Sequence, residues 1–147
     1  MPMAEAEVAS LKDLLAQCTG SERIHKSFLG LRYTDGVNVL AEGAGAYWLI
    51  DAVASHLMEK GRKLDQASGG FQLWTLERHA EPVVAKPSSD GEAVPCQWAL
   101  YCQRDTGARH LVHQEIEFSS FPAELAPFSF FVEGSGAERV MLLKSEH

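Results

Sequence analysis

The sequence predicts an α+β domain in which N-terminal helices pack on one face of an antiparallel sheet of about five strands. Apolar residues recur at helical spacing before residue 60, whereas residues 71–143 contain short runs of β-branched and aromatic residues. Runs of helices followed by runs of strands are typical of α+β proteins. No segment of helical length separates the later strands, which excludes parallel β-α-β units. The length of 147 residues fits a single domain spanning 1–147.

Two helical regions precede the predicted sheet. An apolar stripe over residues 5–18 indicates a short amphipathic helix. Residues 34–36 form a turn, and either of its first two side chains can cap a helix that follows. We therefore predict that residues 34–60 are mostly helical. A break or bend is expected at Gly43 and Gly45, because glycine weakens a helix interior.

The predicted sheet begins after two consecutive glycines and is interrupted by a proline-rich segment. Residues 24–33, ahead of the second helical region, are mixed and indicate an irregular segment that leads into a short strand. Residues 80–95 contain Pro82, Pro87 and Pro95, which disfavour helix and strand and predict a long exposed loop. The predicted strands are 71–78, 96–103, 110–118, 128–132 and 138–143.

The charge balance favours a protein partner over nucleic acid. Thirteen Lys and Arg face twenty Asp and Glu, which gives a net charge of −7. A domain this acidic is repelled by phosphate backbones, so we expect no direct nucleic-acid binding. No apolar run approaches the ~18 residues of a membrane-spanning helix. Residues 1–7 carry acids where a signal peptide carries bases, so we expect no membrane association and a cytoplasmic location.

The cysteines are predicted to be buried thiols. Cys18, Cys96 and Cys102 are odd in number and form no C-x-x-C pair. Cys96 and Cys102 lie on one predicted strand, ~20 Å apart at ~3.3 Å per residue, which is too far for a disulfide. This pattern is typical of a reducing compartment.

Strong catalytic signatures are missing from the sequence. It contains no G-x-G-x-x-G, phosphate-binding loop, G-x-S-x-G or H-E-x-x-H motif, so we predict no cofactor. A weak metal or acid–base candidate is formed by His113, Glu115 and Glu117, which alternation places on one strand face. The interpretation we favour is a solvated outer face of the sheet. The same alternation places His110 on the opposite face.

Aromatic and acidic residues gather around the second helical region. Such groups line pockets or carry interface hot spots, because Tyr and Trp combine a large contact area with a polar handle. The alternative, which we favour slightly, is a turn, a helix cap and a Tyr–Asp pair one turn apart. Trp48 falls opposite the core face of its helix, so either the N-terminal helix covers it or it meets a partner. The candidate binding residues are Tyr33, Asp35, Glu42, Tyr47, Trp48 and Asp51.

The same region carries a resemblance to a known family. The runs Y-T-D-G-V at 33–37, L-A-E at 40–42 and A-G-A-Y-W-L-I-D at 44–51 resemble a bacterial family of small domains of unknown function. The resemblance extends from about Gly20 onward. Members of that family look like proteins of plasmids and conjugative elements. The resemblance therefore implies an accessory role, including interference with host defence complexes, and carries no established activity.

Two functional hypotheses follow. The first is a non-catalytic binding protein that docks on the basic surface of a protein partner, as an inhibitor of a host nucleoprotein complex (anti-CRISPR-like) would do. The second is a small cytoplasmic enzyme with a pocket formed by the candidate residues other than Trp48. An enclosed pocket would favour the enzyme, and a flat acidic and aromatic patch would favour the binding protein. The sequence leaves the oligomeric state open.

Overall fold

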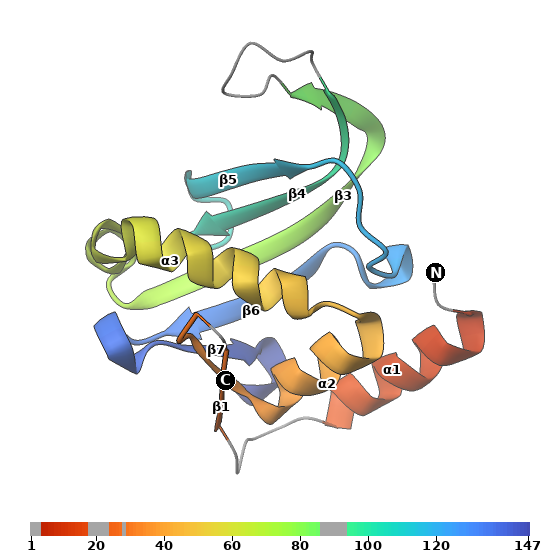
Figure 1. Ribbon diagram of the computed structural model, residues 1–147, viewed down its shortest axis with the longest axis horizontal. Helices are drawn as coiled ribbons and strands as arrows, with labels where there is room; N and C mark the ends of the chain where they lie inside the picture. Colours follow the sequence, from red (N-terminus) through yellow and green to blue (C-terminus); the bar gives the residue numbers. More distant parts are fainter. Residues whose placement is uncertain (1–3, 18–23, 28, 86–93) are drawn as a thin grey trace.

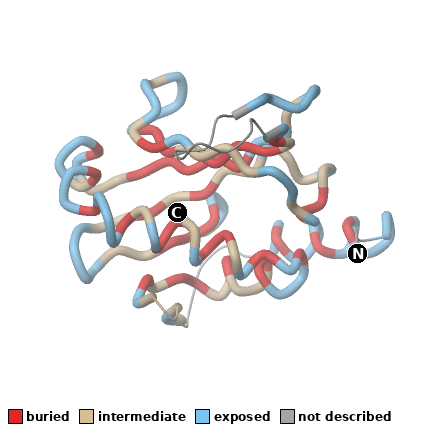
Figure 2. The backbone as a smooth tube through the Cα atoms, turned by 45° about the horizontal axis from the view of Figure 1, so that its top comes forward, coloured by how far each residue is buried: buried red, intermediate tan, exposed pale blue. Residues whose placement is uncertain are grey.

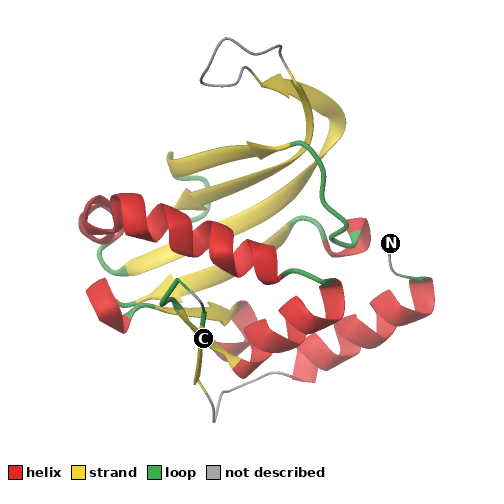
Figure 3. Cartoon of the chain, in the orientation of Figure 1, coloured by secondary structure: helices red, strands yellow, loops and turns green. Residues whose placement is uncertain are grey.

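The computed structural model describes residues 4–17, 24–27, 29–85 and 94–147. Three helices lie on one side of a single seven-stranded sheet with strand order β1-β2-β7-β6-β3-β4-β5 (Figures 1 and 3). The helices are α1 (Glu5–Gln17), α2 (Asp35–Ala44) and α3 (Tyr47–Ser68). The strands are β1 (Ile24–Lys26), β2 (Arg32–Thr34), β3 (Phe71–Ala85), β4 (Val94–Gln103), β5 (His110–Ile116), β6 (Phe128–Glu133) and β7 (Val140–Leu143). Short 3-10 turns are η1 (Ala123–Leu125), η2 (Gly136–Glu138) and η3 (Lys144–Glu146).

The α+β class is confirmed, but the sheet differs from the prediction. It has seven strands rather than about five, and it is mixed because β2 pairs in parallel with β7, with Tyr33 opposite Met141. The other strand pairs are antiparallel. The short strand expected after the irregular segment 24–33 is β2, whereas β1, also of three residues, is too short for a periodic pattern to reveal. No local sequence pattern indicates the pairing of β2 with β7, because these strands are more than one hundred residues apart.

The predicted helical region is two helices, and the second runs further than expected. Gly45 ends α2 in the left-handed conformation (φ 62°), and its N–H bonds the Ala41 carbonyl. Gly43 lies inside α2 and allows close packing, because a Cβ there would stand 2.6 Å from the Leu11 side chain of α1. α3 continues to Ser68, eight residues beyond the predicted end at 60. Gly61 lies within α3 and does not end the helix.

Gly61 instead makes room for an ion pair. Its missing Cβ would lie 2.5 Å from the Arg139 guanidinium. Arg139 crosses the helix there and donates two hydrogen bonds to Asp65, at 2.9 and 2.6 Å, in a half-buried bidentate pair. These hydrogen bonds hold the pKa of Asp65 below its ordinary value. The pair fastens the C-terminal part of α3 to the turn before β7.

We expect Asp65→Asn to lower the free energy of unfolding by about 1–2 kcal/mol at pH 7. Because the pKa of Asp65 is depressed in the folded state, the pair contributes fully above the ordinary aspartate pKa of about 3.9. That contribution is lost as pH falls through the folded-state pKa. Urea unfolding at pH 7 and near pH 2.5 should show the difference shrink in acid. A difference that persists unchanged, or that Glu59→Gln on the same helix reproduces, would contradict this account.

The predicted loop over 80–95 is wrong at both of its ends, because residues 80–85 and 94–95 belong to the strands of a long hairpin arm. β3 continues to Ala85 and β4 begins at Val94, and residues 86–93 lie outside the described residues. The pairing is irregular between Arg78 and Val83. From the Arg78–Trp98 pair to the Val83–Cys96 pair, β3 covers five residues whereas β4 covers only two. Pro82 falls within this irregular stretch, where a missing N–H costs no ladder hydrogen bond. Pro82 therefore marks a bulge in β3. The arm is at the top of Figure 1.

The hydrophobic core lies between the helices and one face of the sheet (Figure 2). Trp74 and Phe130 are fully buried at its centre beneath α3. Cys96 and Cys102 are buried, as predicted, and burial raises the pKa of the Cys102 thiol to about 12. Cys18 lies outside the described residues. None of the described helices is long and apolar enough to cross a membrane.

Candidate functional site

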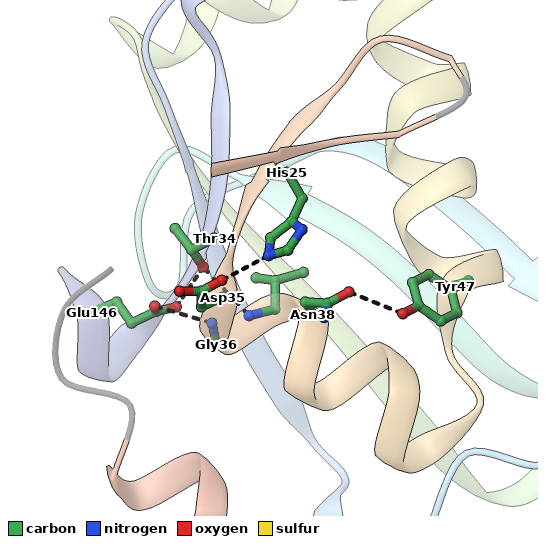
Figure 4. A network of polar contacts seen from close by, with 8 residues as sticks. His25, Thr34, Asp35, Gly36, Asn38, Tyr47 and Glu146 are labelled. Atoms are coloured by element: carbon green, nitrogen blue, oxygen red, sulfur yellow. Dashed lines mark hydrogen bonds and ion pairs between the residues drawn. The ribbon is translucent and has the colours of Figure 1, made fainter. Parts of the chain in front are cut away.

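The N-terminus of α2 is built by residues from both ends of the chain (Figure 4). Thr34 is the N-cap, and its hydroxyl accepts a hydrogen bond from Val37 N at 3.4 Å. The same hydroxyl donates to Glu146 at 2.6 Å, and Gly36 N donates to that carboxylate at 3.2 Å. A carboxylate at this position is favoured by the helix dipole. This network positions α2, and it leaves Asp35 available for a different contact.

Asp35 and Tyr33 are joined through a histidine that the sequence did not single out. His25 Nε2 lies 2.7 Å from Asp35 Oδ1, and its ring packs nearly parallel to Tyr33, with centroids 5.2 Å apart. Tyr33 itself is buried, with 8% of its surface exposed. Burial raises the pKa of Tyr33, and the nearby Tyr47 and Asp51 raise it further. Tyr33 therefore forms the buried part of the site. The sequence did not indicate a role for His25 because its strand has only three residues.

A hydrogen bond links α2 to α3, and three carboxylates lie on the same two helices. The Tyr47 hydroxyl donates to Asn38 Oδ1 at 2.9 Å. Asp35, Asn38 and Glu42 are three and four residues apart, so they share one face of α2, and Asp51 is one turn from Tyr47 on α3. Glu42, Tyr47 and Asp51 are exposed. We call this set, Asp35, Asn38, Glu42, Tyr47 and Asp51, the acidic–aromatic surface.

Trp48 does not belong to that surface. It is half-buried and packs against the core together with Ala52, one turn further along α3. α1 packs against α2, where the Leu11 side chain lies beside Gly43. Helical-wheel geometry put Trp48 opposite the core because it assumed one narrow buried stripe, whereas α3 buries a broader sector of its circumference.

The acidic–aromatic surface is not enclosed. Four cavities formed by the described residues are lined by other side chains, and none of these four includes Tyr33 or a residue of this surface. One of them, of about 230 Å³, lies between α3, the β1–β2 turn and η2, and is lined by Leu31, Leu57 and Arg139 among others. A surface without a cavity offers contact area rather than a place to sequester a substrate.

The outer face of the sheet carries the second group of candidate residues. His113 and Glu115 share a face, as predicted, and His113 Nε2 lies 2.8 Å from Glu115 Oε1. His79 on β3 was missed, and its Nε2 lies 2.7 Å from Glu115 Oε2. Only the register across β4 brings His79 and Glu115 together, so no local signal could have found it. Glu117 follows the end of β5 and is exposed.

His110 is on the same face as His113, which corrects the prediction. Cys102 pairs with Val112 and Gln103 with His110, so β5 contains one extra residue at this point. A bulge of this kind reverses the side-chain alternation. His110 Nδ1 consequently lies 2.9 Å from His113 Nδ1. Among the described residues, no group of three or more potential ligands is placed to hold a metal ion.

Glu115 is ionised at neutral pH. Its burial disfavours the charged form, but hydrogen bonds from His113 and His79 outweigh that effect and hold its pKa below the ordinary value. Two imidazoles thus share one carboxylate on an otherwise open face.

Comparisons with known proteins place this α+β domain in a family. The model of a family of unknown function (DUF6876) matches residues 9–147, and the chain belongs to that family. Neither the search of curated proteins nor that of solved structures gives a match. The predicted kinship with a family of unknown function is confirmed.

Proposed function

We propose that this chain is a non-catalytic protein-binding domain whose acidic–aromatic surface docks on a basic surface of a protein partner. In this proposal it acts in the bacterial cytoplasm as an accessory protein of a plasmid or conjugative element. There it inhibits or modulates a host nucleoprotein or defence complex, in the manner of an anti-CRISPR protein. The observation that carries the binding proposal is the pair of exposed carboxylates, Glu42 and Asp51, on the two helices that the Tyr47–Asn38 hydrogen bond links.

The residues of the surface suit association with a cationic partner. Glu42 and Asp51 form no ion pair with any residue that the structure describes, so both are available to a partner's Lys or Arg. Tyr47 is 45% exposed, and its hydroxyl is held by Asn38, so its ring loses little rotational freedom on binding. The net charge of −7 adds long-range attraction toward a basic surface.

The alternative of a small enzyme has weaker support. It requires a pocket that gathers the acidic and aromatic side chains, and none of the four cavities contains them. Tyr33 faces the protein interior, and Asp35 is engaged with His25. The geometry therefore supports recognition by contact rather than catalysis.

The proposal is tested by removing charge from the surface without changing its shape. We expect Glu42→Gln combined with Asp51→Asn to weaken the complex with a basic partner, isolated from a bacterial host and then purified, by about tenfold or more. The loss follows from removing two attractive charges, and it should shrink as salt rises. Titration calorimetry at low and moderate ionic strength measures both effects.

A control variant that loses the same amount of charge distinguishes the effect of this surface on binding from the effect of net charge. Glu81→Gln combined with Glu124→Gln removes two exposed carboxylates from the arm and from η1. This control should bind nearly as tightly as the unmodified chain. Equal weakening by both double variants would reduce the proposal to a net-charge effect, and full binding by the first variant would overturn it.

A further inference from the structure

A chain of hydrogen bonds crosses the outer face of the sheet from β5 to β3. It runs from His110 to His113 at 2.9 Å, from His113 to Glu115 at 2.8 Å, and from Glu115 to His79 at 2.7 Å. Tyr101 on β4 lies against its exposed end, with its ring stacked on His110 at 4.1 Å between centroids and 8° between planes. This arrangement is independent of the acidic–aromatic surface.

The two histidines at the exposed end meet edge to edge. Their Nδ1 atoms are 2.9 Å apart, whereas their ring centroids are 5.1 Å apart and their planes differ by 17°. Rings this nearly parallel, with nitrogen atoms much closer than centroids, point their Nδ1 atoms at each other. Such a contact is attractive when one Nδ1 carries a proton and the other offers a lone pair.

The carboxylate fixes where the protons lie. Glu115 is ionised and only accepts, so His113 and His79 each donate from Nε2. A neutral His113 that donates from Nε2 has a bare Nδ1. His110 must then donate from its own Nδ1, and every hydrogen bond of the chain is satisfied.

We infer that His110 and His113 form a proton-sharing pair. The two neutral rings together take up one additional proton without losing their contact, and they separate when a second is added. The first proton adds to Nε2 of His110, which continues to donate from Nδ1, so no hydrogen bond is lost. A second proton on His113 would place hydrogens on both facing Nδ1 atoms and set two positive rings in contact. The pair then separates and releases the Tyr101 stack.

The neighbouring charges favour the first proton. On the same face, β3 contributes Glu77 and His79, β4 contributes Tyr101, and β5 contributes Glu115 and Glu117. The turn before β5 adds two exposed cations, Arg104 and Arg109, which oppose the uptake of either proton. Burial and the nearby Glu77 raise the pKa of Tyr101, so its ring stays neutral while the histidines titrate. The ligand of this site is the proton, and its binding changes the charge of the outer face.

Imidazole nitrogen NMR on the full chain, between pH 8 and pH 4.5, tests the inference. At pH 8 we expect His110 to carry its proton on Nδ1 and His113 on Nε2. On acidification His110 should charge first, and the proton on His113 should bind roughly tenfold more weakly or worse. The loss of the Tyr101 stack should accompany only that second step.

Two variants complete the test. His110→Phe keeps a ring against Tyr101 but removes the shared nitrogen, so His113 should then bind its proton at least severalfold more tightly. His147→Gln, which removes an exposed histidine paired with Glu133 elsewhere, should leave both titrations unchanged. Independent titration of His110 and His113, the opposite tautomer on His110 at pH 8, or an unchanged His113 in His110→Phe would each overturn the pair.

Discussion

Trp74→Ala is expected to lower the free energy of unfolding by about 3–5 kcal/mol, the largest effect of any change considered for this protein. The side chain is fully buried, and it packs beneath α3 with the His56 ring 5.9 Å away between centroids. Its removal leaves a cavity between the sheet and the helix that the surrounding strands cannot close. Urea unfolding followed by circular dichroism measures the loss.

Part of this loss of stability comes from the buried side-chain amide of Gln72. Trp74 Nε1 donates to Gln72 Oε1 at 2.9 Å, and Gln72 Nε2 has no hydrogen-bond partner among the described residues. In Trp74→Phe the Gln72 side chain therefore loses its partner while the apolar volume is largely kept. Combining Trp74→Phe with Gln72→Leu should restore about 1–2 kcal/mol relative to Trp74→Phe alone. Strict additivity of the two changes would contradict this coupling.

Glu146→Ala is expected to cost about 2–3 kcal/mol, although the residue lies at the end of the described sequence. Its carboxylate accepts hydrogen bonds from Thr34, Gly36 and Leu143, and it sits at the N-terminus of α2. Thermal and urea unfolding should both report the loss. Ser145→Ala, an exposed neighbour, provides the control and should be nearly neutral.

Gly36→Ala tests the same contact from the helix side. An added Cβ would overlap the Glu146 carboxylate and displace it, so the change should destabilise the unmodified chain by about 1–2 kcal/mol. In the Glu146→Ala background the obstacle is gone, and alanine is the better helix former by up to about 1 kcal/mol. The sign of the effect should therefore reverse. Destabilisation of the same size in both backgrounds would place the strain elsewhere.

The parts of the fold that the sequence predicted are those with a local physical cause. The α2–α3 break was visible because Gly45 is needed in a left-handed conformation, and α1 because its apolar stripe faces one side. The β3–β4 arm was misread because Pro82 usually ends a strand, and only a bulge accommodates it. The parallel β2–β7 pair depends on contacts far apart in sequence, which no local pattern records.

The candidate sites follow the same rule. The sequence grouped Asp35, Glu42, Tyr47 and Asp51 by the density of acidic and aromatic residues in one region, and helical spacing added the pairing of Tyr47 with Asp51. It could not place Trp48, whose environment is set by the breadth of the buried sector of α3. On the outer face, alternation placed His113 and Glu115 correctly and His110 wrongly, because one extra residue in β5 reverses it.

The parallel seam between β2 and β7 has a consequence for the order in which the protein is assembled. β1, β2 and α2 come early in the sequence, yet β2 joins the rest of the sheet through β7, and α2 is capped by Glu146. During synthesis, the residues that form the acidic–aromatic surface leave the ribosome long before their supports exist. The surface is therefore completed only when residues 140–146 pair with β2 and contact α2, and any partner meets it only after those residues have been synthesised.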